Sequence, residues 1–152
     1  MSRTYLFYVQ TVLSEDAIAS FVEPDAPFVD GWRQSRDMQF VVRRMNEVSI
    51  AICAESYGVS TNLRVHFDMN SDDFLAGRTS MLAAVWRIVA ATHGDLLLTA
   101  PDGGAMLWRY KGVGVINADV VGDSSVGHVA DGWIRGGAAD VPPSVPFPAE
   151  LT

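Results

Sequence analysis

Residues 72–117, DDFLAGRTSMLAAVWRIVAATHGDLLLTAPDGGAMLWRYKGVGVIN, decide the fold class of this 152-residue chain. Two capping aspartates open the stretch, and the apolar residues that follow recur at helical spacing, which predicts a long helix ending near His93. Gly94 is typical of the left-handed position that follows a helix. The remainder predicts three strands in succession, with turns at 101–104 and 111–112. A helix followed by a β-meander indicates an α+β domain.

The N-terminal part predicts a strand and then a helix. Residues 4–12 are rich in aromatic and β-branched side chains, which favour a strand. Ser14 is a suitable N-cap for a helix, and that helix should end before Pro24. Residues 24–36 are expected to form a loop.

Up to three strands are expected between residues 38 and 67. One is predicted from the alternation of Val48, Ile50, Ile52 and Ala54, and it should pair antiparallel with a strand around 62–68. That second strand alternates most regularly, so one face should be core and the other exposed. The three polar residues expected on its exposed face are Arg64, His66 and Asp68.

These segments predict one α+β domain over residues 1–137. A single antiparallel sheet of about six strands should be covered by two helices, in the order β-α-β-β-β-α-β-β-β. Residues 138–152 are rich in proline and are expected to form an irregular C-terminal tail.

Composition excludes several functional classes. A net charge of −7 disfavours nucleic-acid binding, which usually depends on clustered Lys and Arg. The single cysteine, Cys53, excludes an intramolecular disulfide and favours a reducing compartment, so a cytoplasmic location is expected. No stretch approaches about 18 uncharged apolar residues, so no membrane span is expected.

The most site-like cluster in the sequence is His66 with Asp68 and Asp72, because a histidine beside carboxylates can hold a metal or transfer protons. The exposed face of a half-buried sheet also requires polar residues, and an aspartate before a helix serves as its cap. Cys53, in its predicted strand, is expected to pack as a small apolar residue and not to act as a nucleophile. We therefore expect no catalytic, cofactor-binding or metal-binding residues.

Two alternatives from other functional classes remain open. One is a small ligand-binding or hydrolase domain that uses His66, Asp68 and Asp72 around a cleft. The other is a scaffold for an unknown partner. An enclosed pocket at His66 would favour the first alternative.

A family resemblance goes further than these patterns. The chain resembles a bacterial family named after an immunity protein of the swarming-inhibition (Sit) toxin systems. The residues that carry the resemblance are Phe67-Asp68, Ala76-Gly77-Arg78, Met81-Leu82-Ala83-Ala84-Val85, His93-Gly94-Asp95, Leu107-Trp108-Arg109 and Val115-Ile116-Asn117.

The resemblance implies a protein that binds and neutralises a cognate toxin, without enzymatic activity or a cofactor. The acidic charge of the chain is compatible with a basic partner, because complementary potentials speed association. We expect the partner to contact the polar strand face at Arg64, His66 and Asp68.

Overall fold

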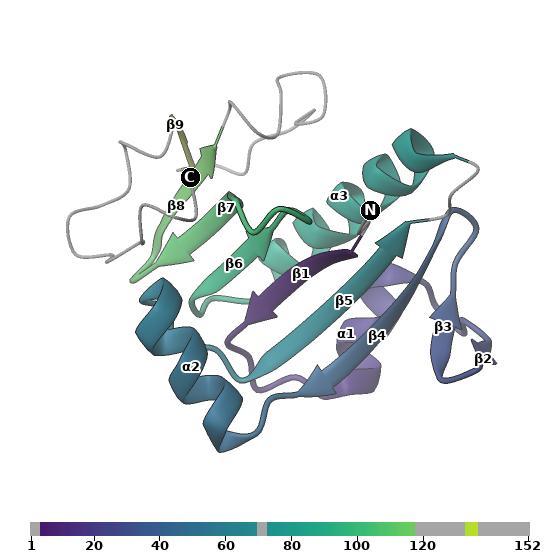
Figure 1. The fold of residues 1–152 in the computed structure, drawn as a ribbon, viewed down its shortest axis with the longest axis horizontal. Helices are drawn as coiled ribbons and strands as arrows, with labels where there is room; N and C mark the ends of the chain where they lie inside the picture. The colour runs from purple at the N-terminus through teal and green to yellow at the C-terminus, as the bar shows by residue number, and fades with distance from the viewer. Residues whose placement is uncertain (1–3, 70–72, 118–132, 137–152) are drawn as a thin grey trace.

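A single β-sheet forms the centre of the protein (Figure 1). The structure is a computed structural model that describes residues 4–69, 73–117 and 133–136. Its nine strands follow the order β2-β3-β4-β5-β1-β6-β7-β8-β9, and every pairing is antiparallel except that of β8 with β9. The elements are β1 (Thr4–Val9), α1 (Glu15–Val22), β2 (Phe28–Val29), β3 (Trp32–Gln34), β4 (Met38–Arg44), α2 (Glu47–Tyr57), β5 (Leu63–Met69), α3 (Phe74–Ala91), β6 (Leu96–Thr99), β7 (Ala105–Tyr110), β8 (Val113–Asn117) and β9 (Ile134–Gly136).

The predicted α+β class and single sheet are confirmed, but the numbers of strands and helices are wrong. The described residues form nine strands in place of about six, and three helices in place of two. Part of the excess comes from residues 24–36, predicted as a loop, where β2 and β3 form a short hairpin at the sheet edge. Strands of two and three residues are too short to show an alternation in the sequence.

Residues 47–57 form helix α2, so the strand predicted there is wrong. The side chain of Asn46 caps the helix by accepting from the backbone N–H of Ser49 at 2.8 Å, and Gly58 ends it in the left-handed conformation with φ of 73°. Apolar residues lie on all sides of this helix and not along one stripe. The sequence therefore lacks the helical spacing of apolar residues, and its local alternation resembles that of a strand. Strand β5 pairs instead with β4 and β1.

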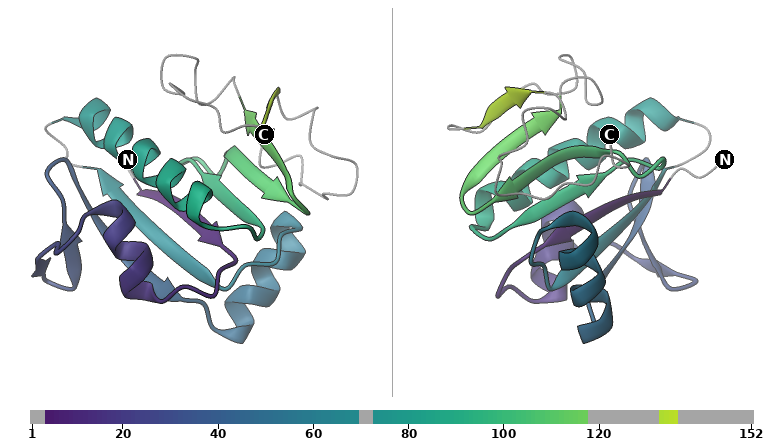
Figure 2. Two further views of the ribbon diagram at one scale, coloured as in Figure 1. Left: turned by 180° about the vertical axis from the view of Figure 1, so that it is seen from behind. Right: turned by 60° about the vertical axis from the view of Figure 1, so that its left-hand side comes forward.

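Helices α1 and α3 cover one face of the sheet and contact each other (Figure 2, left). The side chain of Ser14 caps α1 as predicted, accepting from Ala17 N at 3.1 Å, and Asp73 caps α3 in the same way. The main core lies between these helices and the sheet, and its largest fully buried side chains include Phe7, Ile18, Phe40, Phe67, Met81 and Ile88.

The opposite face of the sheet is covered in part by α2. Alternate residues of the same central strands point to this side and form a second, smaller core around Trp108, which is 1% exposed. Cys53 of α2 packs into this core, as does Val59 just after the helix. In the right panel of Figure 2, α2 comes forward at one end of the sheet and leaves much of β4 and β5 uncovered.

The junction between α3 and β6 is held by close backbone packing. Gly94 does not adopt the left-handed conformation predicted for it. It is required for a different reason, because a Cβ there would lie 2.6 Å from the backbone oxygen of Gln10. The next residue, Asp95, accepts hydrogen bonds from Ser60 N at 3.3 Å and Lys111 N at 3.0 Å. The predicted three-strand meander follows and is confirmed.

Arg109 of β7 binds the C-terminal end of α3 although only 8% of it is exposed. Its guanidinium donates to the carbonyl oxygens of Val89 at 3.2 Å and Gly94 at 2.8 Å. It also donates to the hydroxyl of Thr92 at 3.1 Å, and that hydroxyl donates to Ile88 O. Val89 O also accepts from Thr92 N at 3.4 Å, so the guanidinium adds a second, shorter hydrogen bond there. Its positive charge suits the negative end of the helix dipole.

By length and composition alone, α3 is apolar enough to cross a membrane, although it contains Arg78 and Arg87 and is therefore not a stretch of about 18 uncharged residues. The core helix of a globular protein passes the same test. Seven residues of α3, including Met81 and Ile88, are buried on the sheet.

Trp133 attaches the last described segment to the domain. Its ring packs directly on Gly114 of β8 and meets Trp86 edge-on with centroids 5.2 Å apart. Strand β9 follows at once. The predicted tail, residues 138–152, lies outside the described residues, so the domain boundary at residue 137 stays a prediction.

Substituting Arg109→Met should lower the free energy of unfolding by about 2–4 kcal/mol, because several buried oxygen atoms lose their donor. Chemical denaturation measures the change. The matched control is Arg36→Met, since Arg36 is exposed and should change stability by less than about 0.5 kcal/mol. Equal effects of the two substitutions would contradict this role of Arg109.

Candidate partner-binding face

A polar surface, here called the open face, lies on strands β3, β4 and β5, on the side of the sheet opposite α1 and α3. In Figure 1 these two helices lie behind β1, β5 and β4, so the view is onto this face. Antiparallel register places its side chains in rows that cross the strands. Its members are Trp32, Gln34, Gln39, Val41, Arg43, Arg64, His66 and Asp68.

The first row is a chain of amide and carboxylate groups. Gln34 Nε2 donates to Gln39 Oε1 at 3.3 Å, and Gln39 Nε2 donates to Asp68 Oδ2 at 2.9 Å. Asp68 is therefore positioned by its neighbour across the strand.

The second row contains His66, which is half-buried between β4 and β1. Its imidazole stacks with the indole of Trp32 at 6.5 Å between centroids. Burial lowers the pKa of His66 from its usual 6.5, and the charges of Arg64 and Arg43 lower it further. The neutral imidazole is thus favoured near pH 7.

The third row places two arginines side by side. Arg43 of β4 is directly opposite Arg64 of β5, and Tyr8 of β1 is the next residue in the row. Like charges at opposite positions destabilise a sheet. Neither arginine forms a salt bridge with a carboxylate of the described residues.

A pocket of about 230 Å³ opens beside this row, between α2 and the sheet, and is called the α2 pocket here. Burial, followed by the neighbouring Tyr57 and Cys53, raises the pKa of Tyr8 to about 12. Burial also raises the pKa of the Cys53 thiol, which lies 3.4 Å from the Thr61 hydroxyl. The expectation that Cys53 packs as an apolar residue holds, although in a helix and not in a strand. The pocket is lined by Tyr8, Met45, Ser49, Ile52, Cys53, Ser56, Tyr57 and Arg64.

His66 and Asp68 lie on one face of the sheet, as predicted, but their side chains contact different neighbours. Asp68 accepts from Gln39 and His66 stacks with Trp32, and neither lines the α2 pocket. Asp72, the third member of the alternative hydrolase cluster, lies outside the described residues. Within the described ranges, no three His, Cys, Asp or Glu side chains are grouped as metal ligands would be.

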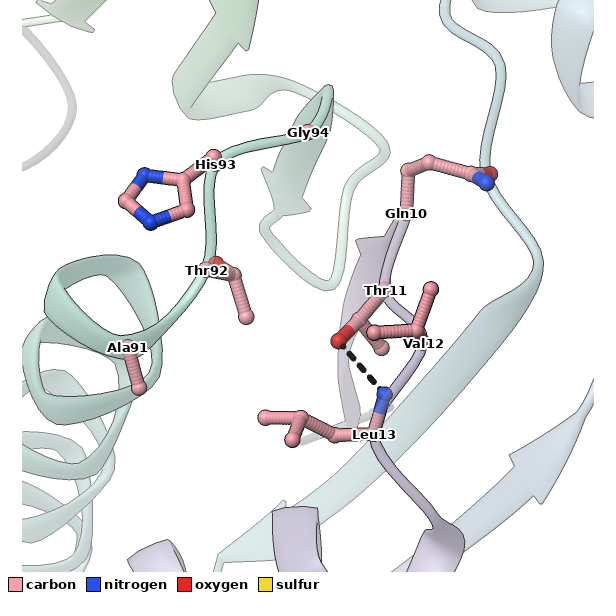
Figure 3. A pocket seen from close by; sticks show the side chains of 8 residues that line it. All are labelled: Gln10, Thr11, Val12, Leu13, Ala91, Thr92, His93 and Gly94. Carbon is pink, nitrogen blue, oxygen red and sulfur yellow. Dashed lines mark hydrogen bonds between the residues drawn. The ribbon is translucent and has the colours of Figure 1, made fainter.

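Figure 3 shows a further pocket, of about 300 Å³, where the β1–α1 loop meets the end of α3. The side chain of Val12 is 97% exposed beside it, and the Thr11 hydroxyl accepts from Leu13 N at 3.1 Å. His93 is the single ionisable group among its lining residues, Gln10–Leu13 and Ala91–Gly94. The pocket therefore lacks a partner for acid–base chemistry.

A groove of about 320 Å³ on the helical side also has a structural explanation. Arg87 in its wall donates to Phe21 O at 2.7 Å at the end of α1. Ser80 and Ser35 donate to Asp37 and Glu23 respectively. These polar groups join α1, α3 and the start of β4.

Sequence reasoning missed the whole α2 pocket, because a strand was predicted at residues 48–54, and it missed Arg43, because its place beside Arg64 depends on strand order. The signal that could have found the pocket is the pair of helix boundaries, Asn46 followed by Glu47 at one end and Gly58 at the other. A helix at this position necessarily covers one end of the β5 face.

The fold and the open face define a small α+β protein with one sheet, helices packed on one side and a polar, partly uncovered surface on the other. The chain belongs to the SitI3-like family, whose model matches residues 4–120. No curated protein and no solved structure matches it. Family membership suggests an immunity-type protein and a non-enzymatic role, as the resemblance implied.

Replacing Arg64 by Gln should raise the pKa of His66, and Arg43→Gln should raise it less, because Arg64 has the larger effect of the two. NMR titration of the imidazole protons measures the pKa. Arg36→Gln is the control and should leave it unchanged. The assignment of these charges fails if neither substitution on the open face moves the His66 titration.

The same shift has a consequence for stability. The folded-state pKa of His66 lies below the value of 6.5 taken for the unfolded chain, so the unfolded chain binds the proton first. The stability due to this histidine is therefore complete above pH 6.5 and decreases as the pH falls towards the folded-state pKa.

Proposed function

We propose that the protein is an immunity protein that neutralises a cognate bacterial toxin by binding it stoichiometrically, without catalysis or a cofactor. The observation that carries the proposal is membership of the SitI3-like family over residues 4–120. A toxin partner follows from this membership in general terms. We further propose that the protein acts in the cytoplasm.

The open face is the contact surface that we propose, at Arg64, His66 and Asp68. All three side chains are part-exposed, and Asp68 and His66 are held by Gln39 and Trp32, so these two lose little freedom when a partner binds. Aromatic and arginine side chains, such as Trp32 and Arg64, are the groups that dominate interface energies. The core residues behind the face keep these side chains in place.

Co-expression with the toxin-like protein encoded beside this gene should restore growth to cells that the toxin alone arrests. Purified proteins should form a complex of fixed stoichiometry, measured by calorimetry. If no toxin-like gene lies beside this one and co-expression rescues no toxin, the proposed function is wrong.

Arg64→Glu should weaken toxin binding by about 10–100-fold, because it removes an arginine from the proposed contact surface and reverses the charge at that position. The control Arg36→Glu makes the same charge change in the groove on the helical side and should bind as the unchanged protein does. A complex that tolerates Arg64→Glu as well as Arg36→Glu would place the contact surface elsewhere.

A further inference from the structure

The third row of the open face carries two neighbouring positive charges on an acidic protein. The chain has 18 Asp and Glu residues against 11 Lys and Arg. Even so, Arg43 and Arg64 are cross-strand neighbours, and no described carboxylate forms a salt bridge with either. Such an arrangement costs stability unless a negative group is supplied from outside.

The α2 pocket places hydroxyl groups around one of these arginines. Tyr8, Tyr57, Ser49 and Ser56 line it together with Arg64, and the lining contains no Asp or Glu. Because the pKa of Tyr8 is about 12, its hydroxyl keeps its proton at neutral pH. The pocket thus combines a guanidinium with hydroxyl donors, the groups that bind an anionic oxygen in proteins.

Apolar atoms complete the pocket and favour one source of that anion. Met45 and Ile52 line it beside the polar groups, and they suit the methylene carbons of a side chain better than a small inorganic ion. Ile52 is 57% exposed, and Val48, one helical turn earlier on α2, is 67% exposed. These two residues form an apolar rim on which a protein surface can pack.

We propose that the α2 pocket binds a glutamate side chain of the partner protein, with its carboxylate at Arg64 and Arg43 beside it and its methylene groups against Ile52 and Met45. This inference rests on the proposed function, since it supposes a protein partner. It also changes the expected chemistry of that partner. The net charge favours a basic partner, but the surface that meets α2 should present an acidic group.

The test uses the free protein and two blocked tripeptides, acetyl-Gly-Glu-Gly-amide and acetyl-Gly-Gln-Gly-amide, with inorganic phosphate as a third probe. Backbone NMR shifts are followed at constant ionic strength. The glutamate peptide should shift residues of α2 and Arg64 in a saturable way. It should bind at least about fivefold more tightly than the glutamine peptide or phosphate, because only it supplies both charge and methylene groups.

Arg64→Gln should weaken binding of the glutamate peptide by about tenfold, and Arg36→Gln should not change it. Arg43 is exposed, so Arg43→Gln serves as a second variant if Arg64→Gln does not fold, and it should weaken binding by about threefold.

Three results would overturn the proposal. They are no saturable shift at tens of millimolar peptide, equal binding of the glutamate and glutamine peptides, and equal binding of phosphate, which would indicate a general anion site. Because no toxin takes part, the two proposals fail separately. Growth rescue without peptide binding would contradict only the proposed glutamate site. Peptide binding without growth rescue would contradict only the proposed immunity function.

Discussion

The fold depends on one buried guanidinium. Arg109 reaches from β7 to the carbonyl oxygens of Val89 and Gly94 and to Thr92, at the point where the longest helix gives way to the sheet. Burial lowers the pKa of this arginine and the nearby Asp95 opposes the shift, so the charge is kept where helix carbonyls can use it. Without these bonds Gly94 O and the Thr92 hydroxyl would lose this donor, and Val89 O would keep only the 3.4 Å bond from Thr92 N, which is costly at a buried helix end. This contact fixes the C-terminal end of α3 at the start of the β6–β7 pair, and the buried apolar residues of α3 complete its packing on the sheet.

Sequence reasoning predicted the elements whose signals agree with one another. For α3 the apolar spacing and the capping aspartate indicate the same structure, and for the following strands the turn residues separate clear apolar runs. Helix α2 was missed because Val48, Ile50 and Ile52 are β-branched and alternate, which favours a strand locally. The helix forms because of the caps at Asn46 and Gly58 and because Cys53 packs into the buried cluster that also contains Trp108. Packing across 55 residues of sequence cannot be read from a local pattern.

The candidate site was also predicted only in part, for the residues of β5 and not for their neighbours on other strands. The alternation of β5 correctly put Arg64, His66 and Asp68 on one face, since a period of two follows from strand geometry alone. Their neighbours Trp32 and Arg43 depend on strand order, which one sequence does not specify. The residues that carry the family resemblance have a different role in the structure: Gly94, Asp95 and Arg109 close the helix–sheet junction. They preserve the framework, while Arg64 and His66 of the proposed contact surface lie outside these motifs.

The central place of β1 in the sheet affects how the protein folds. The first described strand has β5 on one side and β6 on the other, and Thr99 reaches Leu6 across a separation of 93 residues. During synthesis one edge of β1 therefore stays unpaired until residues near 99 have emerged, and it presents free backbone groups beside apolar side chains. Folding dominated by such distant contacts is slow compared with that of helical bundles. A delay between translation and the folded, binding-competent state is thus built into the order of the strands.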